Sequence, residues 1–237
     1  MLEDIILRIA AAESLPETLP PDPLPILTSW YVQAKSDKLT PNPDAIALAT
    51  ATTDAAPAVR IVLARRIDPD GALVFYTNRL SRKGEHLAAN PLAAAVFHWD
   101  HHGRQARAEG FVVHATDSES DEYFARRALL SRLGACASRQ STPLASRKDL
   151  ITAVAAAATR LRISVDSLLS GSSPVSIPRP PHWGGYRLWF ERLELWCGGN
   201  GRLHDRAVWT RSRADDSPVA PGQTPRFLPW SAQRLSP

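Results

Sequence analysis

The sequence contains few cysteines, and its apolar runs are short. Cys136 and Cys197 are the two cysteines among 237 residues, too few for a disulfide framework or a four-ligand zinc site, so we expect a cytoplasmic protein. The apolar runs fall short of the roughly 20 residues that a membrane-spanning helix needs. Acidic Glu3 and Asp4 are atypical of a secretory signal. We therefore expect neither export nor a membrane partner.

Lysine is also scarce, so arginine carries nearly all the positive charge. The net charge is +4, from 28 basic and 24 acidic residues, and the lysines are Lys35, Lys38, Lys83 and Lys148. The guanidinium group of arginine can form two parallel hydrogen bonds with a phosphate group. A GC-rich genome explains most of such a bias, so only the positions of the arginines can indicate an anionic ligand.

Several familiar functional motifs are missing from the sequence. It has no GxGxxG, GxxxxGK[ST] or GxSxG pattern, which excludes the usual dinucleotide, P-loop and hydrolase signatures. No RNP, helix-turn-helix or zinc-finger pattern is present, so we expect no nucleic-acid partner. His98, Asp100, His101 and His102 cluster at a predicted hairpin turn, but they lack the spacing that fixes a metal site. We therefore expect no metal.

The pattern of the chain predicts one domain of short strands and helices behind an arm. Residues 1–24 are predicted to be a flexible arm, because prolines 16–25 oppose both a helix and a central strand, and residues 25–237 to be a single domain. The predicted strands are 44–51, 59–67, 72–78, 92–100, 104–116, 186–196, 203–211 and 226–230, and the predicted helices are 25–37, 81–90, 117–133 and 146–163. Hairpin turns such as DPDG at 68–71 favour a mainly antiparallel, barrel-like α+β fold.

Two groups of cations fall near strand ends. Arg60 and Arg65 share the predicted strand 59–67, and their odd spacing sends them to opposite faces, so they should not clamp one phosphate together. Residues 76–78 and 81–83 place hydroxyls and two cations where a strand ends and a helix begins, a natural anion site. The alternatives are arginines that solubilise an apolar strand and an ordinary solvated first turn.

Two further sets of side chains have a spacing that brings them together. Arg202, His204 and Arg206 are two residues apart on a predicted strand, so they should project from one face. Tyr123 and Arg127 lie four apart on a predicted helix and share a face, with Ser131 roughly 80° further round. An exposed edge strand and a solvated helix surface explain these sets equally well when each is taken alone.

Taken together, these segments resemble the FMN-dependent pyridoxine/pyridoxamine 5′-phosphate oxidases. The matching stretches are RIVL at 60–63, VFYTN-x-x-SRK at 74–83, RQ at 104–105, YF-x-x-R at 123–127, S-x-QS at 138–141, P-x-x-WGGYR at 180–187, ELW-x-GG-x-x-RLHDR at 194–206 and the terminal RLSP. They occur in the same order as in the family, from about Pro20 to the C-terminus. The resemblance implies a Greek-key split β-barrel with flanking helices, and a homodimer with FMN at the interface.

The resemblance also implies which residues form the site. FMN would be bound by Arg60, Ile61, Val62, Leu63, Tyr76, Thr77, Arg82, Lys83, Gln105, Gln140, Ser141, Trp196 and Arg206. The substrate phosphate would be bound by Arg65, Tyr123, Arg127 and Ser131. Arg202 and His204 would bind the substrate ring and act as the catalytic residues, covering that ring against the flavin.

The implied activity is that of a pyridoxal 5′-phosphate synthase. Pyridoxamine or pyridoxine 5′-phosphate would be oxidised to pyridoxal 5′-phosphate, with O2 as acceptor and H2O2 as product. The alternatives are a phenazine-biosynthesis-type flavin oxidase and a non-catalytic protein that binds FMN or pyridoxal phosphate. The sequence departs from the family in three places: Arg65 replaces the usual lysine, residues 1–24 lack an Arg-x-x-Tyr motif, and the loop 212–225 is long.

Overall fold

The computed structural model describes residues 1–10 and 13–237. The helices are α1 (Leu2–Ala10), α2 (Leu24–Asp37), α3 (Arg82–Ala89), α4 (Asp117–Ala125), α5 (Leu129–Ala137), α6 (Arg147–Arg160) and α7 (Val165–Ser170), with short 3-10 helices η1 (Asp100–His102) and η2 (Asn200–Arg202). The strands are β1 (Ala45–Ala51), β2 (Pro57–Leu63), β3 (Arg66–Asp68), β4 (Ala72–Asn78), β5 (Leu92–Trp99), β6 (Arg104–His114), β7 (Trp183–Cys197), β8 (Asp205–Thr210) and β9 (Ser231–Leu235).

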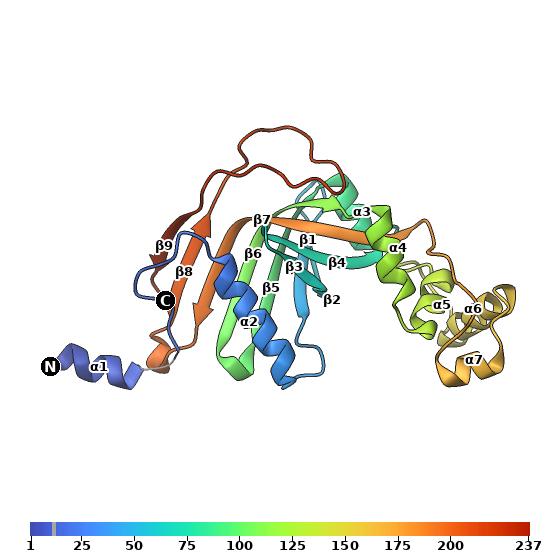
Figure 1. Ribbon diagram of the computed structural model, residues 1–237, viewed down its shortest axis with the longest axis horizontal. Coiled ribbons are helices and arrows are strands. Elements are labelled where there is room, and N and C mark those ends of the chain that lie inside the picture. Colours follow the sequence, from blue (N-terminus) through green and yellow to red (C-terminus); the bar gives the residue numbers. More distant parts are fainter. Residues whose placement is uncertain (11–12) are drawn as a thin grey trace.

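The nine strands of the described chain form one antiparallel sheet in the order β2-β1-β5-β6-β7-β4-β3, with β8 and β9 branching from β7 (Figure 1). The long strand β7 pairs with β6 along one side. Along its other side it pairs first with β4 and then with β8. This arrangement confirms the predicted mainly antiparallel α+β fold, and it places β8 and α4 at opposite ends of β7.

The first and last strands in this order, β2 and β3, are consecutive in the chain and are joined by only two residues, Ala64 and Arg65, which we call the corner. The prediction of one continuous strand over 59–67 is therefore wrong. The amide of Ala64 donates to the carbonyl of Asp44 before β1, and the amide of Arg65 donates to the carbonyl of Val74 in β4, each at 2.8 Å. The chain thus changes its pairing partner within two residues. The sheet curls back on itself there, although the described strands do not close it by hydrogen bonds.

The single helix predicted over 117–133 is interrupted at residues 126–128, so α4 and α5 are separate helices. In a continuous helix Phe124 and Leu129 would point roughly 140° apart, at about 100° per residue. The interruption lets both side chains reach one apolar cluster, in which each is at most 2% exposed. Burial of these two side chains therefore outweighs the local preference for a continuous helix.

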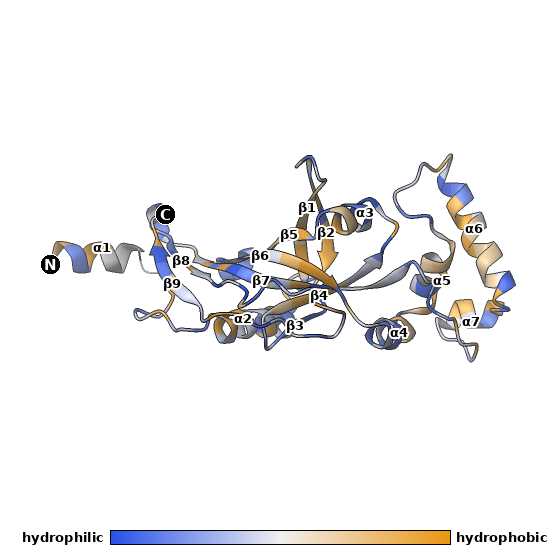
Figure 2. Ribbon diagram, turned by 90° about the horizontal axis from the view of Figure 1, so that it is seen from above, coloured by the Kyte–Doolittle hydropathy of each residue, from blue (hydrophilic) through white to orange (hydrophobic). Residues whose placement is uncertain are grey.

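Helix α2, which confirms the prediction for 25–37, packs against the main core of the sheet. Trp30 meets Trp99 edge to face at 6.5 Å between ring centroids, and Tyr31 meets Phe97 in the same way at 5.9 Å. A second, smaller core joins residues of α4, α5 and α6 to Trp183 at the start of β7. Figure 2 shows the resulting elongated outline, with α1 at one end and α6 and α7 at the other.

The predicted arm, residues 1–24, contains helix α1 and then runs beside β8. The amide of Leu15 donates to Asp205 at 2.8 Å, and the indole of Trp209 donates to the carbonyl of Pro20 at 2.8 Å. The flexibility of the arm stays a prediction. None of the described helices is both long and apolar enough to cross a membrane.

The prediction of a strand over 226–230 is wrong, because the last strand is β9 at Ser231–Leu235. Pro229 lacks the amide that a ladder needs, and Phe227 forms only an isolated bridge with Arg213. The loop before β9 is instead fixed by Arg211, whose guanidinium lies 3.6 Å from the ring centroid of Phe227.

Candidate functional site

Most of the predicted site residues line one cavity of about 630 Å³, between β2, the end of β4, the start of α3 and α4. The predicted residues in its wall are Arg60, Ile61, Val62, Leu63, Arg65, Tyr76, Thr77, Arg82, Lys83, Tyr123, Arg127, Gln140 and Ser141. The cavity therefore brings together residues predicted for the cofactor and residues predicted for the substrate phosphate.

Lys83 is buried in this cavity among neutral oxygen atoms. Its Nζ lies 3.2 Å from Thr77 Oγ1, 3.0 Å from Ser81 Oγ and 3.4 Å from Gln140 Oε1, and the residue is 7% exposed. Burial, together with the nearby Arg60, lowers the pKa of Lys83 to about 8. Within residues 1–10 and 13–237 no carboxylate forms an ion pair with it. A bound anion would stabilise this charge.

Arg60 and Arg82 complete a first group of cations around Lys83. Arg60 donates from Nη1 to the carbonyl of Leu48 at 3.0 Å and to Thr50 Oγ1 at 2.8 Å, both on β1. Burial and the neighbouring Arg82 lower the pKa of Arg60. Three cations from β2 and the first turn of α3 thus gather on one side of the cavity, and all three are residues for which the resemblance implies FMN binding.

A second group of cations lies beside an aromatic stack. The rings of Tyr76 and Tyr123 are nearly parallel, with centroids 4.0 Å apart, and the guanidinium of Arg127 is 4.7 Å from the centroid of Trp183. Arg65 lies over the Tyr123 ring at 5.8 Å. Burial lowers the pKa of Arg127, whose Nη1 is buried without a hydrogen-bond partner in the described structure. A buried donor without a partner is costly, so this atom is available to an acceptor on a ligand.

Arg65 is held at the corner by an acidic partner. Its Nη1 lies 2.9 Å from Oδ2 of Asp44, whose side chain is 12% exposed. Because β2 ends before residue 65, the argument from alternating strand faces does not apply, and Arg60 and Arg65 line the same cavity. That they serve different ligands stays a prediction. Ser131 lies in an adjoining cavity of about 490 Å³, whose wall also includes Arg127.

The remaining predicted residues form a second set at the other end of the sheet. We call Gln105, Trp196, Arg202, His204 and Arg206 the turn group. Gln105, Trp196 and Arg206 lie directly opposite one another on β6, β7 and β8. The rings of Trp196 and His204 have centroids 4.7 Å apart. None of the five lines the 630 Å³ cavity.

The geometry of the turn differs from the prediction. β8 begins at Asp205, and Arg202 lies in η2 with a φ of 64°, so Arg202, His204 and Arg206 do not project from one regular strand face. The turn is tight at Gly199, where a Cβ atom would lie 2.0 Å from the carbonyl oxygen of Leu203. The amide of Gly199 donates to Nδ1 of His204 at 3.1 Å, which fixes the orientation of the imidazole ring.

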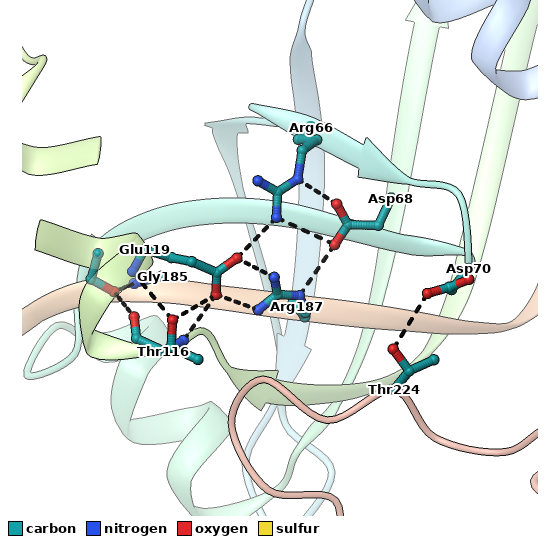
Figure 3. A network of polar contacts seen from close by, with 9 residues as sticks. Arg66, Asp68, Asp70, Thr116, Glu119, Gly185, Arg187 and Thr224 are labelled. Carbon is teal, nitrogen blue, oxygen red and sulfur yellow. Dashed lines mark hydrogen bonds and ion pairs between the residues drawn. The ribbon is translucent and has the colours of Figure 1, made fainter. Parts of the chain in front are cut away.

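Sequence reasoning missed a ring of four charged side chains, Arg66, Asp68, Glu119 and Arg187 (Figure 3). Glu119 of α4 accepts two hydrogen bonds from Arg187 of β7 and one from Arg66 of β3, while Asp68 accepts from both arginines. Hydrogen bonds from Arg187, then from Arg66 and Thr116, hold the pKa of Glu119 at about 2 despite its burial. The sequence feature that could have indicated this ring is the WGGYR motif at 183–187, because it contains Arg187 as well as Trp183.

The curled antiparallel sheet and the cation-lined cavity at its edge define a protein of the split-barrel class. Two solved structures share this architecture. PhzG from Burkholderia lata 383, in complex with tetrahydrophenazine-1-carboxylic acid, has a TM-score of 0.77 and 29% identity over 96% of this chain and 100% of that one. A pyridoxamine 5′-phosphate oxidase-related, FMN binding protein from Nostoc punctiforme PCC 73102 has a TM-score of 0.63 and 16% identity, over 91% and 98% of the chains, and shows the fold alone.

The sequence matches identify the family within this class. Residues 32–161 match the family described as pyridoxamine 5′-phosphate oxidase, and residues 183–237 match the pyridoxine 5′-phosphate oxidase C-terminal dimerisation region. A pyridoxine/pyridoxamine 5′-phosphate oxidase of Burkholderia orbicola is 43% identical over 92% of this chain and 90% of its own length. One from Cupriavidus metallidurans is 45% identical over the same shares. The chain belongs to the pyridoxine/pyridoxamine 5′-phosphate oxidase family.

Proposed function

We propose that the protein is a cytoplasmic, FMN-dependent oxidase that converts pyridoxamine or pyridoxine 5′-phosphate to pyridoxal 5′-phosphate. The observation that carries this proposal is the presence of two groups of cations in one cavity, one around Lys83 and one around Arg127. An aromatic stack lies beside the second group. Two anionic groups on two flat ligands, a flavin phosphate and a substrate phosphate, match this arrangement.

The residues present fit FMN. Lys83 is a buried cation surrounded by neutral oxygen atoms, and Arg60 and Arg82 stand beside it, so a phosphate dianion would bind in their midst. Thr77 and Gln140 offer a hydroxyl and an amide at the same place. FMN, when bound, would supply the two-electron redox chemistry that amino-acid side chains lack.

The second group of cations would bind and orient the substrate. Arg65 and Arg127 would bind its phosphate together with the Tyr123 hydroxyl, and Ser131 would extend this site from the adjoining cavity. For pyridoxamine 5′-phosphate the overall reaction consumes dioxygen and water and yields pyridoxal 5′-phosphate, ammonia and hydrogen peroxide. His204, oriented by Gly199, would cover the substrate ring together with Arg202.

A complete site would require a second copy of the chain. The turn group lies at the opposite end of the sheet from α4 and outside the cavity. Val59 and Ile61 of the edge strand β2, which line the rim of the cavity, are 69% and 66% exposed. The match to a dimerisation region over residues 183–237, which includes most of the turn group, supports a homodimer in which the partner completes the cavity. A flavin-loaded monomer in light scattering would contradict this arrangement.

A phenazine-type oxidase is the second candidate, favoured by the similarity to PhzG. Such an enzyme would act on a tricyclic carboxylate and would not use a substrate-phosphate group. The unpaired Nη1 of Arg127 and its position near Arg65 favour a phosphorylated substrate.

The deciding experiment is an assay of the FMN-loaded protein with pyridoxamine 5′-phosphate, pyridoxine 5′-phosphate and a reduced phenazine carboxylate. We expect aldehyde formation with stoichiometric peroxide from at least one of the phosphorylated substrates. Turnover of the phenazine alone would establish the second candidate. Binding of pyridoxal 5′-phosphate without turnover of any substrate would indicate a carrier and overturn the proposal.

A further inference from the structure

The ring of Arg66, Asp68, Glu119 and Arg187 lies on the same face of the sheet as the aromatic stack. Arg66, Val74 and Arg187 are directly paired across β3, β4 and β7, so their side chains share one face. Tyr76 lies two residues after Val74, and therefore on this face as well. Trp183 lies four residues before Arg187 on β7 and also shares it. The charged ring and the aromatic stack are thus neighbours on a single surface.

Gly185, between Trp183 and Arg187 on β7, lets the aromatic stack form at this place. It is paired with Tyr76, and a Cβ atom there would lie 2.7 Å from the Tyr76 ring. The amide of Gly185 donates to Ser120 Oγ of α4 at 3.1 Å. Helix α4 is thereby held directly against the strand surface beside Tyr76.

Glu119 joins this surface to the helix that bears Tyr123. It occupies the third position of α4, where it closes a capping box with Thr116. Tyr123 follows four residues later and therefore lies on the same side of the helix. Arg187 is 9% exposed, and its guanidinium reaches Glu119 Oε2 at 2.8 Å and Asp68 Oδ2 at 3.2 Å. One buried guanidinium on β7 therefore fixes both the start of α4 and the strand that follows Arg65.

The ring is balanced in charge, with two guanidinium groups and two carboxylates, so it has no free charge to offer a ligand. Its members touch the elements that carry the phosphate-binding residues without lining the cavity themselves. We propose that Arg187 and Glu119 are positioning residues for the substrate phosphate, which hold Tyr123, Arg127 and the corner at Arg65 in one constellation. This inference rests on the proposed phosphate site of the function above.

The test uses the FMN-loaded full chain with Arg187→Met and Glu119→Gln, two variants that keep most of the side-chain volume. We measure the Kd for pyridoxal 5′-phosphate and for FMN, together with KM and kcat for pyridoxamine 5′-phosphate. We expect the Kd for pyridoxal 5′-phosphate and KM to rise about tenfold or more, since small misplacement of a binding group is costly. The FMN Kd and kcat should stay within about threefold, because Lys83 and its neighbours lie outside the ring.

The matched control is Arg126→Met, which breaks an exposed ion pair with Glu122 on the same helix. This control should leave both Kd values, KM and kcat unchanged. A second experiment asks whether Arg187 acts through Arg127. In an Arg127→Met background, Arg187→Met should weaken pyridoxal 5′-phosphate binding less than it does in the wild-type background, whereas independent roles would give additive losses.

The outcomes separate the inference from the function on which it rests. If wild-type protein binds pyridoxal 5′-phosphate but turns over nothing, the proposed oxidase activity fails, and the binding data alone decide the inference. Unchanged pyridoxal 5′-phosphate affinity in Glu119→Gln and Arg187→Met, or equal losses of FMN and pyridoxal 5′-phosphate, would overturn it. Failure of wild-type protein to bind pyridoxal 5′-phosphate would overturn both.

Discussion

The cavity and the turn group contain similar residue types in different electrostatic states. In the cavity, Lys83 is buried and Arg127 is half-buried with its Nη1 inaccessible to solvent, and in the part of the chain described here neither forms an ion pair with a carboxylate. In the turn group, Arg206 donates from Nε and Nη2 to Glu194 Oε1 at 3.1 and 2.8 Å, and Glu194 is 2% exposed. The cavity therefore has unbalanced positive charge, whereas Arg206 of the turn group is paired with a buried carboxylate.

This difference indicates different tasks for the two regions. Buried cations that lack counter-ions are destabilising until an anion binds, so the cavity is suited to hold phosphates. The turn group instead presents a fixed aromatic pair, Trp196 and His204, whose flat faces can cover a planar ring. Each region would be half of a site, and the following predictions test that division.

The largest effect is expected from the double variant Arg82→Ala/Lys83→Ala. Two charge-assisted contacts of roughly 1.5–3 kcal/mol each would be lost, so FMN affinity should fall by more than about a hundredfold. Flavin absorbance of the purified protein and titration of the apoprotein measure this loss. Arg147→Ala/Lys148→Ala, which alters an exposed Arg-Lys pair at the start of α6, is the control and should keep its flavin. Full flavin content in Arg82→Ala/Lys83→Ala would refute the proposal that Arg82 and Lys83 bind FMN.

Arg65→Ala should affect the substrate side of the cavity alone. A loss of about 1.5–3 kcal/mol corresponds to a decrease of one to two decades in kcat/KM for pyridoxamine 5′-phosphate, with FMN content unchanged. Because this variant leaves Asp44 unpaired, Arg65→Ala/Asp44→Asn serves as the companion that removes the stranded carboxylate. Arg65→Lys should retain much of the activity. Loss of FMN with an unchanged KM would show that Arg65 binds FMN and not the substrate phosphate.

The pH dependence of FMN binding should depend on Lys83. Burial lowers its pKa to about 8 in the free protein, and a bound phosphate favours the protonated amine and raises that pKa. FMN affinity should therefore be constant below pH 8 and fall by up to about tenfold per pH unit above it. Titrations from pH 6.5 to pH 9.5 measure how FMN affinity changes with pH. The Lys83→Met variant should bind FMN more weakly, and its affinity should not fall above pH 8. An unchanged slope in that variant would assign the titration to another group.

The smallest expected effect is a partial recovery of activity in hybrid dimers, which tests whether one site contains residues from two chains. Arg127→Met and Arg202→Met should each be nearly inactive, since one lacks a cavity cation and the other a turn-group cation. Random reassociation makes half of the dimers hybrids, and each hybrid has one intact site, so about a quarter of wild-type activity should return. Co-expression with two affinity tags provides the hybrids. Hybrids without activity would mean that each chain builds its own site.

Much of the fold could be predicted from periodicity, because the strands 44–51 and 72–78 and the helix 25–37 show their patterns locally. The errors fall where tertiary contacts override local pattern. The residues 59–67 are all suited to a strand. However, β2 pairs with β1 and β3 pairs with β4, so the strand is broken at Ala64 and Arg65. The sequence of one segment does not show which strand it pairs with. The interruption at 126–128 likewise depends on a core to which other helices contribute.

The site was predicted through motifs, and the structure sorts those motifs into two places. Gln105 and Arg82 were predicted for one cofactor, yet Gln105 lies on β6 outside the cavity and Arg82 lies at the start of α3 in the cavity wall. Spacing along a sequence contains no information about which half of a symmetric assembly a residue serves. Arg187 and Glu119 were missed for a related reason. The two residues lie 68 positions apart in the sequence, and neither residue alone differs from an ordinary surface charge.

At the corner formed by Ala64 and Arg65, the length of the chain is fixed, whereas the side chain at position 65 can change. Two consecutive amides are committed to partners on different sides of the sheet, Asp44 just before β1 and Val74 in β4, so the link has no spare length. An inserted or deleted residue would force one of two hairpins out of register and turn its apolar side chains towards water. The side chain at position 65 is under no such restriction and can be exchanged for another cation. Under the proposed role of Arg65, substrate preference would therefore change here by substitution, while the length of the chain at this point stays constant.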